Sequence, residues 1–414
     1  MKFTRLRPIT TTVCLGGALL ATAPLAHAQA DSMKMEKLEK DNAELRKRLD
    51  ALESMAQKDG TLPSGKAVPK FVSAMSDMTL SGFVTASYFY DTSKPPGHTS
   101  PGYLWNRKSD SFSLNKVKLT IANAPAERSG DKFSAAYRVS LIYGEDAPIV
   151  NSGSSTTGFE SLREAYVELN VPVGTGLNVK AGELISLLNY ESGDGGAVND
   201  NFSQGYQWFY TGNGPAAGLQ LGYTFTDWFD LKVRVQNGLY AGPIDNNGSK
   251  TFVASLNFKP SPKLWFNLIG WTGREDAAFT QFVDGGSLIG GYKVTDQFSI
   301  GTELDYFSFK NSTGSHPVWS TGGWFSYAFT PKFGAAIRAE FLSDEDGVDA
   351  SGDPLGFPSN SGQDLTSIAF TLNYKPLPNV KIQPEVRYDH TTLANGFGTQ
   401  RDRVILGVGV SYLF

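Results

Sequence analysis

From Thr79 to Phe414 the hydrophobic and polar positions alternate with a period of two, which predicts β-strands with two different faces. The last segment puts large apolar residues on one face and mostly small or polar residues on the other. The segment 380–389 carries charges in mid-strand: Lys381, Glu385, Arg387 and Asp389. A dry core between two sheets tolerates few such charges, whereas a water-filled interior accommodates them. The alternation therefore favours an all-β transmembrane antiparallel barrel over a soluble sandwich.

Short turns and long polar loops alternate strictly along the same region. We predict seven short turns, at 127–130, 172–176, 226–228, 261–263, 294–296, 330–332 and 377–379, and eight loops, at 92–110, 144–158, 189–215, 240–249, 273–280, 310–316, 344–362 and 392–400. This asymmetry is typical of outer-membrane barrels, which have tight periplasmic turns and long external loops. The connections predict sixteen strands. Fourteen or eighteen remain open, because the strand patterns within 79–110 and 189–225 are the weakest.

Aromatic residues gather near the predicted strand ends. We expect them to form the two aromatic girdles that flank the apolar band of a membrane barrel. The residues are Tyr88, Tyr90, Trp228, Phe298, Tyr327, Phe329, Tyr374 and Tyr412.

The first 28 residues have the features of a secretory signal peptide. A basic start precedes a mostly apolar stretch at 13–25 that is too short to span a membrane, and residues 26–28 read Ala-His-Ala, a cleavage site. The only cysteine, Cys14, lies inside this segment, so the mature chain relies on its fold alone for stability. The sequence thus predicts export.

Residues 29–60 contain a heptad pattern that predicts a coiled-coil helix in the periplasm. Three heptads are marginal as an isolated helix, so we expect self-association, with a lone amphipathic helix as the alternative. The predicted core is Met35, Leu38, Asn42, Leu45, Leu49 and Leu52. Asn42 at such a position favours two strands. Residues 61–78 are rich in Pro and Gly and predict a linker to a barrel at 79–414.

Composition and charge narrow the class of protein. Charged residues are 19% and aromatic residues 12% of the chain, which excludes a disordered protein. Beyond the signal no apolar run approaches the ~18 residues of a membrane helix. The formal net charge of −4 becomes −7 once the signal takes away its three positive charges, and so acidic a chain is no nucleic-acid binder. We predict no cofactor.

The chain resembles the β-barrel porin-2 (OmpL-like) family. The resemblance rests on the signal, the coiled coil, the opening strand Leu80-Ser81-Gly82-Phe83-Val84 and the terminal Ser411-Tyr412-Leu413-Phe414. It implies an outer-membrane porin for passive diffusion of small polar solutes and ions, embedded among outer-membrane lipid and lipopolysaccharide. It also implies that the barrel-assembly machinery reads Tyr412 and Phe414, and that three copies associate, so a trimer is favoured over the dimer.

We expect the pore to be narrowed by loop 189–215, the longest loop, which folds inward at the corresponding place in general porins. Its acids Glu191, Asp194 and Asp200 would face a basic wall, although ordinary solvated loop charges are an equal alternative. Strand parity points six cations into the lumen, because each would cost ~2–4 kcal/mol in mid-membrane. They are Lys116, Lys118, Arg138, Lys180, Lys232 and Arg234. Opposed rows of charge would orient polar solutes and set ion preference.

Other functions have weaker support. The acids of 344–353 lack calcium-loop spacing, so we predict no metal site there. An outer-membrane lipid hydrolase would need a base beside a nucleophile, yet His98, His316 and His390 are preceded by no serine motif. We therefore predict no catalysis. A structural tether or adhesin-like barrel, anchored through the coiled coil, is the stronger alternative to a porin. Single-channel recording separates these readings.

Overall fold

The computed structural model describes residues 44, 47, 48, 50 and 51 and residues 78–414, except 104–105, 152–157, 212–213, 240–243, 246, 276–280, 345 and 348–361. The signal peptide, the linker up to residue 77 and all six coiled-coil core residues lie outside this part. The five described N-terminal residues are helical, and Arg48 Nε lies 3.2 Å from Glu44 Oε1 one turn away. The coiled coil stays a prediction.

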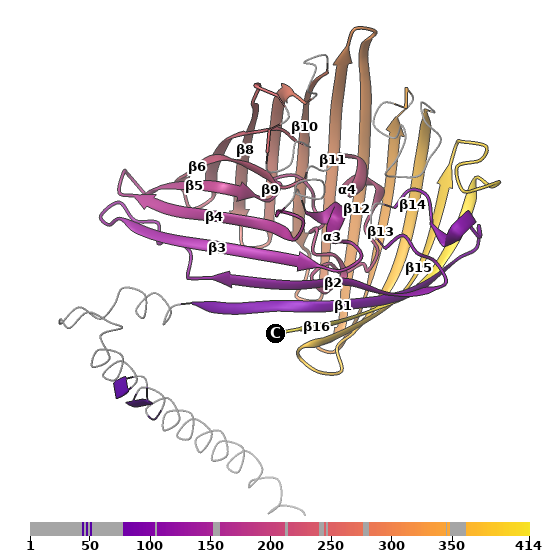
Figure 1. The fold of residues 1–414 in the computed structure, drawn as a ribbon, viewed down its shortest axis with the longest axis horizontal. Coiled ribbons are helices and arrows are strands. Elements are labelled where there is room, and N and C mark those ends of the chain that lie inside the picture. The colour runs from indigo at the N-terminus through magenta and orange to yellow at the C-terminus, as the bar shows by residue number, and fades with distance from the viewer. Residues whose placement is uncertain are drawn as a thin grey trace, which may run out of the picture. The chain divides into compact units, whose positions relative to one another are not determined.

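Residues 78–414 form a closed barrel of sixteen antiparallel strands, as predicted (Figure 1). Each strand pairs with its sequence neighbours, and β1 closes the ring against β16 through pairs such as Val84 with Tyr412. The strands are β1 Thr79–Asp91, β2 Ser111–Ala122, β3 Ser134–Tyr143, β4 Leu162–Val171, β5 Leu177–Leu184, β6 Ala216–Thr226, β7 Phe229–Gln236, β8 Thr251–Ser261, β9 Leu264–Arg274, β10 Phe282–Lys293, β11 Phe298–Asn311, β12 Gly314–Thr330, β13 Phe333–Asp344, β14 Gln363–Tyr374, β15 Val380–Thr391 and β16 Asp402–Leu413.

Within the described residues of 78–414, helices are few and short. They are the 3-10 turns η1 Pro96–His98 and η2 Gly195–Ala197 and the α-helices α3 Ala147–Val150 and α4 Tyr206–Thr211. Among the described residues, no helix is long and apolar enough to cross a membrane.

The alternation of the strands separates an apolar outer face from a largely polar inner face. In β16, Leu406, Val410 and Tyr412 are exposed on the outside, whereas Arg403 and Ser411 are buried inside. The same division runs around the ring, so the outward apolar side chains form a band that suits lipid. Near the turns this band ends in aromatic contacts, including Trp228 with Phe258 and Tyr327 with Phe329. Of the predicted girdle residues, Trp228, Tyr327, Phe329, Tyr374 and Tyr412 are exposed at this end, whereas Tyr88 and Tyr90 lie near the opposite end of β1.

The strict alternation of short and long connections was wrong at two places. We call the end of the barrel with the two-residue connection 331–332 the turn end and the opposite end the loop end. At the loop end, β11 and β12 are joined by residues 312–313 alone, so the predicted loop 310–316 is a tight hairpin that continues the ladder from Lys310–Ser315 (Figure 1). At the turn end, residues 123–133 form an eleven-residue connection instead of the turn 127–130.

The lumen is not polar throughout. Inward-facing Trp271, Val283, Phe307 and Val318 are buried in one hydrophobic cluster, which also contains Leu239 and the α4 residues Tyr206, Phe209 and Tyr210. Loop segments that fold into a barrel must cover their own apolar side chains, and these strands supply the partners. Part of the interior that we predicted to be filled with water is therefore filled by packed hydrophobic side chains.

Candidate functional site: a loop held inside the barrel

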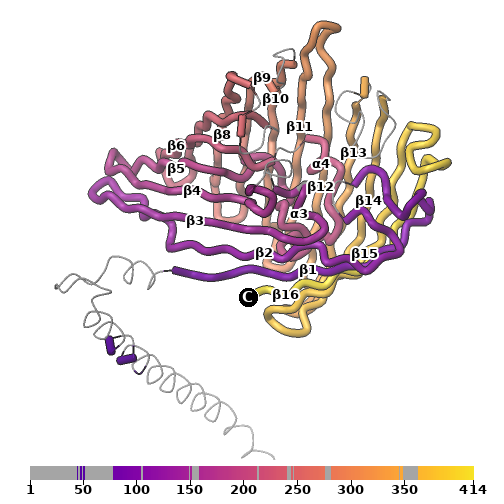
Figure 2. Tube along the Cα trace, in the orientation of Figure 1, coloured from indigo at the N-terminus to yellow at the C-terminus, as the bar shows by residue number. Residues whose placement is uncertain are grey.

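The connection between β5 and β6, residues 185–215, lies inside the ring of strands, where α4 contacts β11, β12 and β13 (Figure 2). We call it the inner loop. Asn189 bends the chain with a φ of 79°, an unusual value that asparagine tolerates better than most residues. At Gly205 a Cβ atom would lie 1.9 Å from Glu340 Oε1, so any larger residue here would displace the Glu340 carboxylate.

Carboxylates of the barrel wall accept the backbone N–H groups of the inner loop. Glu303 on β11 accepts from Tyr190 at 2.7 Å, and Glu340 on β13 accepts from Gln207 at 3.2 Å. Glu385 on β15 accepts from Phe202 at 2.8 Å and from Ser203 at 3.1 Å. A loop packed inside a barrel would otherwise leave these donors buried and unpaired, at a cost of ~1–3 kcal/mol each.

Cations of the wall satisfy the loop carbonyls in the same way. Lys381 donates to the Gly196 oxygen at 3.0 Å, and Arg387 donates to the Gln204 oxygen at 2.7 Å. Lys381 is buried, as is Gln383 beside it, which donates to the Asn199 oxygen at 3.1 Å. The wall from β11 to β15 is thus a template for the backbone of the inner loop.

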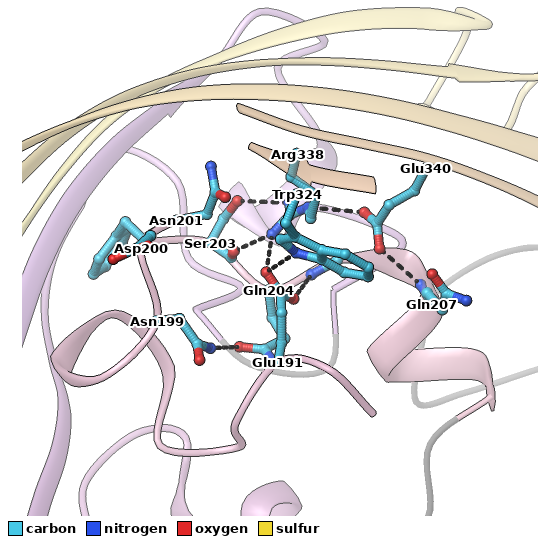
Figure 3. Close-up of polar contacts among 12 residues, drawn as sticks. Glu191, Asn199, Asp200, Asn201, Ser203, Gln204, Gln207, Trp324, Arg338 and Glu340 are labelled. Carbon is cyan, nitrogen blue, oxygen red and sulfur yellow. Dashed lines mark hydrogen bonds and ion pairs between the residues drawn. The ribbon is translucent and has the colours of Figure 1, made fainter. Parts of the chain in front are cut away.

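Glu191 ties the inner loop to β12 and β13 (Figure 3). Its Oε1 accepts from Arg338 Nη1 at 2.9 Å and from Trp324 Nε1 at 3.2 Å, and its Oε2 accepts from the Gly205 N–H at 2.9 Å. Arg338 also lies 2.9 Å from Glu340. The Glu191 and Arg338 side chains are 3% and 0% exposed, so this acid–base contact is sealed from the lumen.

A second buried cluster joins three segments at the loop end of the barrel. The Arg387 guanidinium lies 4.7 Å from the ring centroids of both Tyr103 and Tyr206, and that of Arg403 lies 4.1 Å from the Phe397 ring. Asp389 bridges the two arginines at 2.6 and 2.9 Å. Burial raises the pKa of the Tyr103 and Tyr206 phenols well above the ordinary value. This cluster connects segment 92–110, the inner loop and segment 392–401.

The predicted acids of the loop have three different environments. Glu191 pairs with Arg338, and Asp194 pairs with Lys118 at 2.6 Å. Asp200 is exposed, and no described cation lies within ion-pair distance of it. Only one of the three acids therefore presents an unpaired carboxylate.

The predicted basic residues also fall into two groups. Lys116, Lys118 and Arg234 are buried: Lys116 lies 3.0 Å from Asp146, and Arg234 donates to Gln220 at 2.7 Å. Arg138, Lys180 and Lys232 are partly exposed on the inner face of β3–β7. The Arg138 side chain is 38% exposed beside Glu164, and that of Lys180 is 25% exposed, 3.7 Å from Glu168. These residues line accessible space, which the inner loop does not cover.

Sequence reasoning missed the residues that hold the loop. Strand parity could have found the wall side of each contact, because all of them face inward. No local signal shows which inward charge meets which loop atom, since the partners are more than one hundred residues apart in most cases. The missed residues are Glu303, Asp305, Arg338, Glu340 and Arg403, the last of which donates to the Tyr206 hydroxyl at 3.2 Å.

Residues 345 and 348–353 of the acidic segment lie outside the described residues, and among the described ones no group of three or more His, Cys, Asp or Glu side chains could hold a metal ion. Asp344 is buried, and Asp346 lies 3.0 Å from His316. His98 and His390 likewise lie near single aspartates, Asp110 at 3.4 Å and Asp402 at 2.8 Å. Each histidine thus belongs to a separate loop-end pair.

A recess of about 480 Å³ lies at the turn end below the inner loop. Tyr190 stacks on Trp324 with ring centroids 4.6 Å apart and lies parallel to Trp265 at 6.2 Å. Tyr190 and Trp265 line the recess, together with polar residues that include Asp200 and Asn373. The recess gives the lumen a mixed aromatic and polar surface on the side of β9–β14.

A closed sixteen-stranded barrel with an apolar belt and an inward loop defines a porin-type barrel of the bacterial outer membrane. The family model described as "Putative beta-barrel porin-2, OmpL-like" matches residues 77–414. The chain belongs to this family. A comparison with curated proteins found no match.

Solved porin structures share the fold at low sequence identity. The chain is similar to an anion-selective porin from Comamonas acidovorans, at 11% identity and a TM-score of 0.54, over 81% of this chain and 99% of that one. It is similar to the trimer form of OmpT from Vibrio cholerae, at 12% identity and a TM-score of 0.53, over 81% of this chain and 99% of that one. It is also similar to the outer membrane channel DcaP of Acinetobacter baumannii, at 12% identity and a TM-score of 0.51, over 81% of this chain and 97% of that one. At these identities the likeness shows the fold alone.

Proposed function

We propose that this protein forms a water-filled channel through the outer membrane for passive diffusion of small hydrophilic solutes and ions. The observation that carries the proposal is the partly exposed polar inner face of β3–β7, which lies behind an exposed apolar outer face. Arg138, Lys180 and Lys232 line this face. Sixteen-stranded barrels are wide enough to leave an aqueous channel.

The inner loop is the constriction in this proposal. Its anchoring on β11–β15 leaves the β3–β7 side as the path. Because Glu191 and Asp194 are paired with wall cations, the transverse field proposed for the constriction would come from Asp200 on one side and from Arg138, Lys180 and Lys232 on the other. Opposed charges of this kind orient polar solutes and bias ion passage.

We also propose a homotrimer, with the coiled coil of residues 29–60 in the periplasm. A porin of similar fold is described as a trimer, and a heptad segment next to the barrel would add a second contact between copies. The expected result is three equal closing steps per insertion event. The variant Leu45→Lys should reduce cross-linked trimer. Single closing steps and unchanged cross-linking would contradict this arrangement.

The outward apolar band and its aromatic girdle would contact outer-membrane lipid and lipopolysaccharide. The C-terminal strand, with Tyr412 facing outward and Phe414 hydrogen-bonded to Gly82 at 2.9 and 3.0 Å, would be the segment read by the barrel-assembly machinery. Replacing Phe414 by Ser should lower the amount of folded barrel in the outer membrane while leaving refolding in detergent intact.

Swelling of liposomes tests the channel. Vesicles that contain the refolded chain should swell in isotonic solutions of small sugars, and more slowly as the sugar grows larger. A folded barrel that gives no swelling would support a structural tether instead. Release of fatty acids from the vesicles would support a lipid hydrolase.

A further inference from the structure

The unexpected eleven-residue connection 123–133 at the turn end lies across the ends of three strands. Asn170 on β4 is fully buried and donates to the Ser129 and Lys132 oxygens, both at 2.8 Å. Asn123 accepts from the Tyr137 N–H at 2.7 Å. The connection therefore has a fixed path from β3 towards β6, which a four-residue turn could not follow.

This path carries Arg128 to the inner face of β6. Its Nη1 donates to Thr224 Oγ1 at 2.7 Å, and its Nη2 lies 3.7 Å from the position that a Cβ atom on Gly222 would occupy. Gly222 is the register partner of Lys232 on β7 and of Asn178 on β5. The missing side chain at Gly222 thus leaves room for the Arg128 guanidinium beside Lys232.

Lys180 lies on β5 on the same inner face, two residues further from the turn end than Asn178. It pairs in register with Gln220 on β6, two residues from Gly222. The charges of Arg128 and Lys180 both act on Lys232, together with those of buried Arg234 and of a single acid, Asp230. Arg128, Lys180 and Lys232 therefore form one group of cations, which we call the basic trio.

The neighbouring carboxylates are already engaged by neutral donors. Asp230 accepts from Asn257 Nδ2 at 2.8 Å, and Glu168 accepts from Asn178 Nδ2 at 2.6 Å while it lies 3.7 Å from Lys180. Neither Arg128 nor Lys232 has an ion pair with a carboxylate in the described part of the chain. Arg128 is exposed and Lys232 is half-buried. Three cations therefore face two carboxylates, Glu168 beside Lys180 and Asp230 near Lys232, so a net positive charge remains in accessible space.

We propose that the basic trio is a binding site for small multivalent oxyanions, of the class of inorganic phosphate, at the turn end of the channel. A guanidinium fork with two ammonium groups suits an anion with several oxygens, because arginine gives paired donors and lysine gives mobile point charges. The site rests on the proposed channel function and adds the class of solute that the channel favours. It shares Lys180 and Lys232 with the basic side of the proposed constriction and adds Arg128, which comes from connection 123–133.

The test measures current through single channels in potassium chloride while inorganic phosphate is added. Phosphate should reduce the chloride current of the natural chain with a saturable dependence on concentration. The double variant Arg128→Gln/Lys232→Gln should need about tenfold more phosphate for half the effect. Arg128→Lys, which keeps the charge and loses the fork, should fall between the two.

Controls separate the possible failures. Lys108→Gln removes one charge at the loop end, where Lys108 bonds Thr99 at 2.6 Å, and should leave the phosphate effect unchanged. A natural chain that conducts without any response to phosphate overturns the site but not the channel. Equal weakening by Lys108→Gln overturns it as well, because the effect would then be general charge screening.

A natural chain that never conducts contradicts the channel itself. If the double variant does not fold, Arg128→Lys alone decides, and an unaltered response to phosphate overturns the site.

Discussion

Glu191 and Arg338, which are 147 positions apart in the sequence, form an ion pair of 2.9 Å that is closed off from solvent on both sides. The pair joins the inner loop to β13, and Glu191 also accepts from Trp324 and Gly205. A charge that loses its partner in such a place is left uncompensated, which costs about 3–5 kcal/mol. If the inner loop narrows the channel as proposed, this contact helps to set the width of the channel.

Glu191→Gln should therefore loosen the inner loop without unfolding the ring of strands. We expect larger and noisier single-channel currents and faster cleavage of the loop by added protease. The matched control is Asp296→Asn, which removes an ion pair with Lys293 at the barrel surface, where the Asp296 side chain is 95% exposed, and should change neither. Currents and cleavage rates that match those of the natural chain would show that the pair does not hold the loop.

Ion preference should follow exposure rather than charge alone. Arg138→Gln and Lys180→Gln, which remove partly exposed lumen cations, should shift the reversal potential in a salt gradient towards cation preference. Lys116→Gln should shift it less, because Lys116 is 4% exposed and is neutralised by Asp146 at 3.0 Å. An equal shift from all three variants would contradict the division of the wall into buried and accessible cations.

The two faces of one strand should differ in their tolerance of charge. Leu268 on β9 faces outward and is 43% exposed to the lipid side, whereas its neighbour Asn267 faces the lumen. Leu268→Arg should lower the free energy of unfolding by about 2–4 kcal/mol in vesicles, and Asn267→Arg by much less. Equilibrium unfolding in urea measures both values. A larger loss of unfolding free energy for Asn267→Arg than for Leu268→Arg would contradict the assignment of the apolar face to lipid and of the polar face to the lumen.

The loop-end cluster predicts an effect of alkaline pH. Burial raises the pKa of Tyr206, so its phenol stays neutral in the folded protein while the unfolded chain ionises near pH 10. Below pH 10 the cluster keeps its full contribution to stability, and this contribution falls as the pH rises further. In the folded state, the number of tyrosines that ionise up to pH 11, measured by ultraviolet absorbance, should be the same for the natural chain and for Tyr206→Phe. In denaturant the two should differ by one tyrosine, and the same difference in the folded state would refute the burial.

The sequence predicts the barrel because alternation records, strand by strand, which side meets lipid. It fails at Lys310–Pro317, where polar residues occur equally in a loop and in a hairpin that extends past the apolar band. It fails at 123–133 for the opposite reason, since only Glu127–Gly130 has a turn-like composition although the ladder already ends at Ala122. The length over which two strands pair depends on the residues of both strands. The pattern within one segment shows only the residues of that segment.

The lumen was predictable in direction but not in pairing. Parity predicts inward faces for Lys116, Lys118, Arg138, Lys180, Lys232 and Arg234, and the burial of these strands follows the same period of two. It cannot show that Lys118 meets Asp194, because that contact depends on the path of the inner loop across the barrel. The same limit hid Arg338 and Arg403, whose partners come from distant segments.

Single-channel recording of the purified natural chain in planar bilayers tests the central claim most directly. The account predicts stepwise, long-lived currents that grow in proportion to salt concentration, as expected for a permanently water-filled lumen. A correctly folded, heat-modifiable barrel that inserts into the bilayer and carries no current at any salt concentration would contradict it.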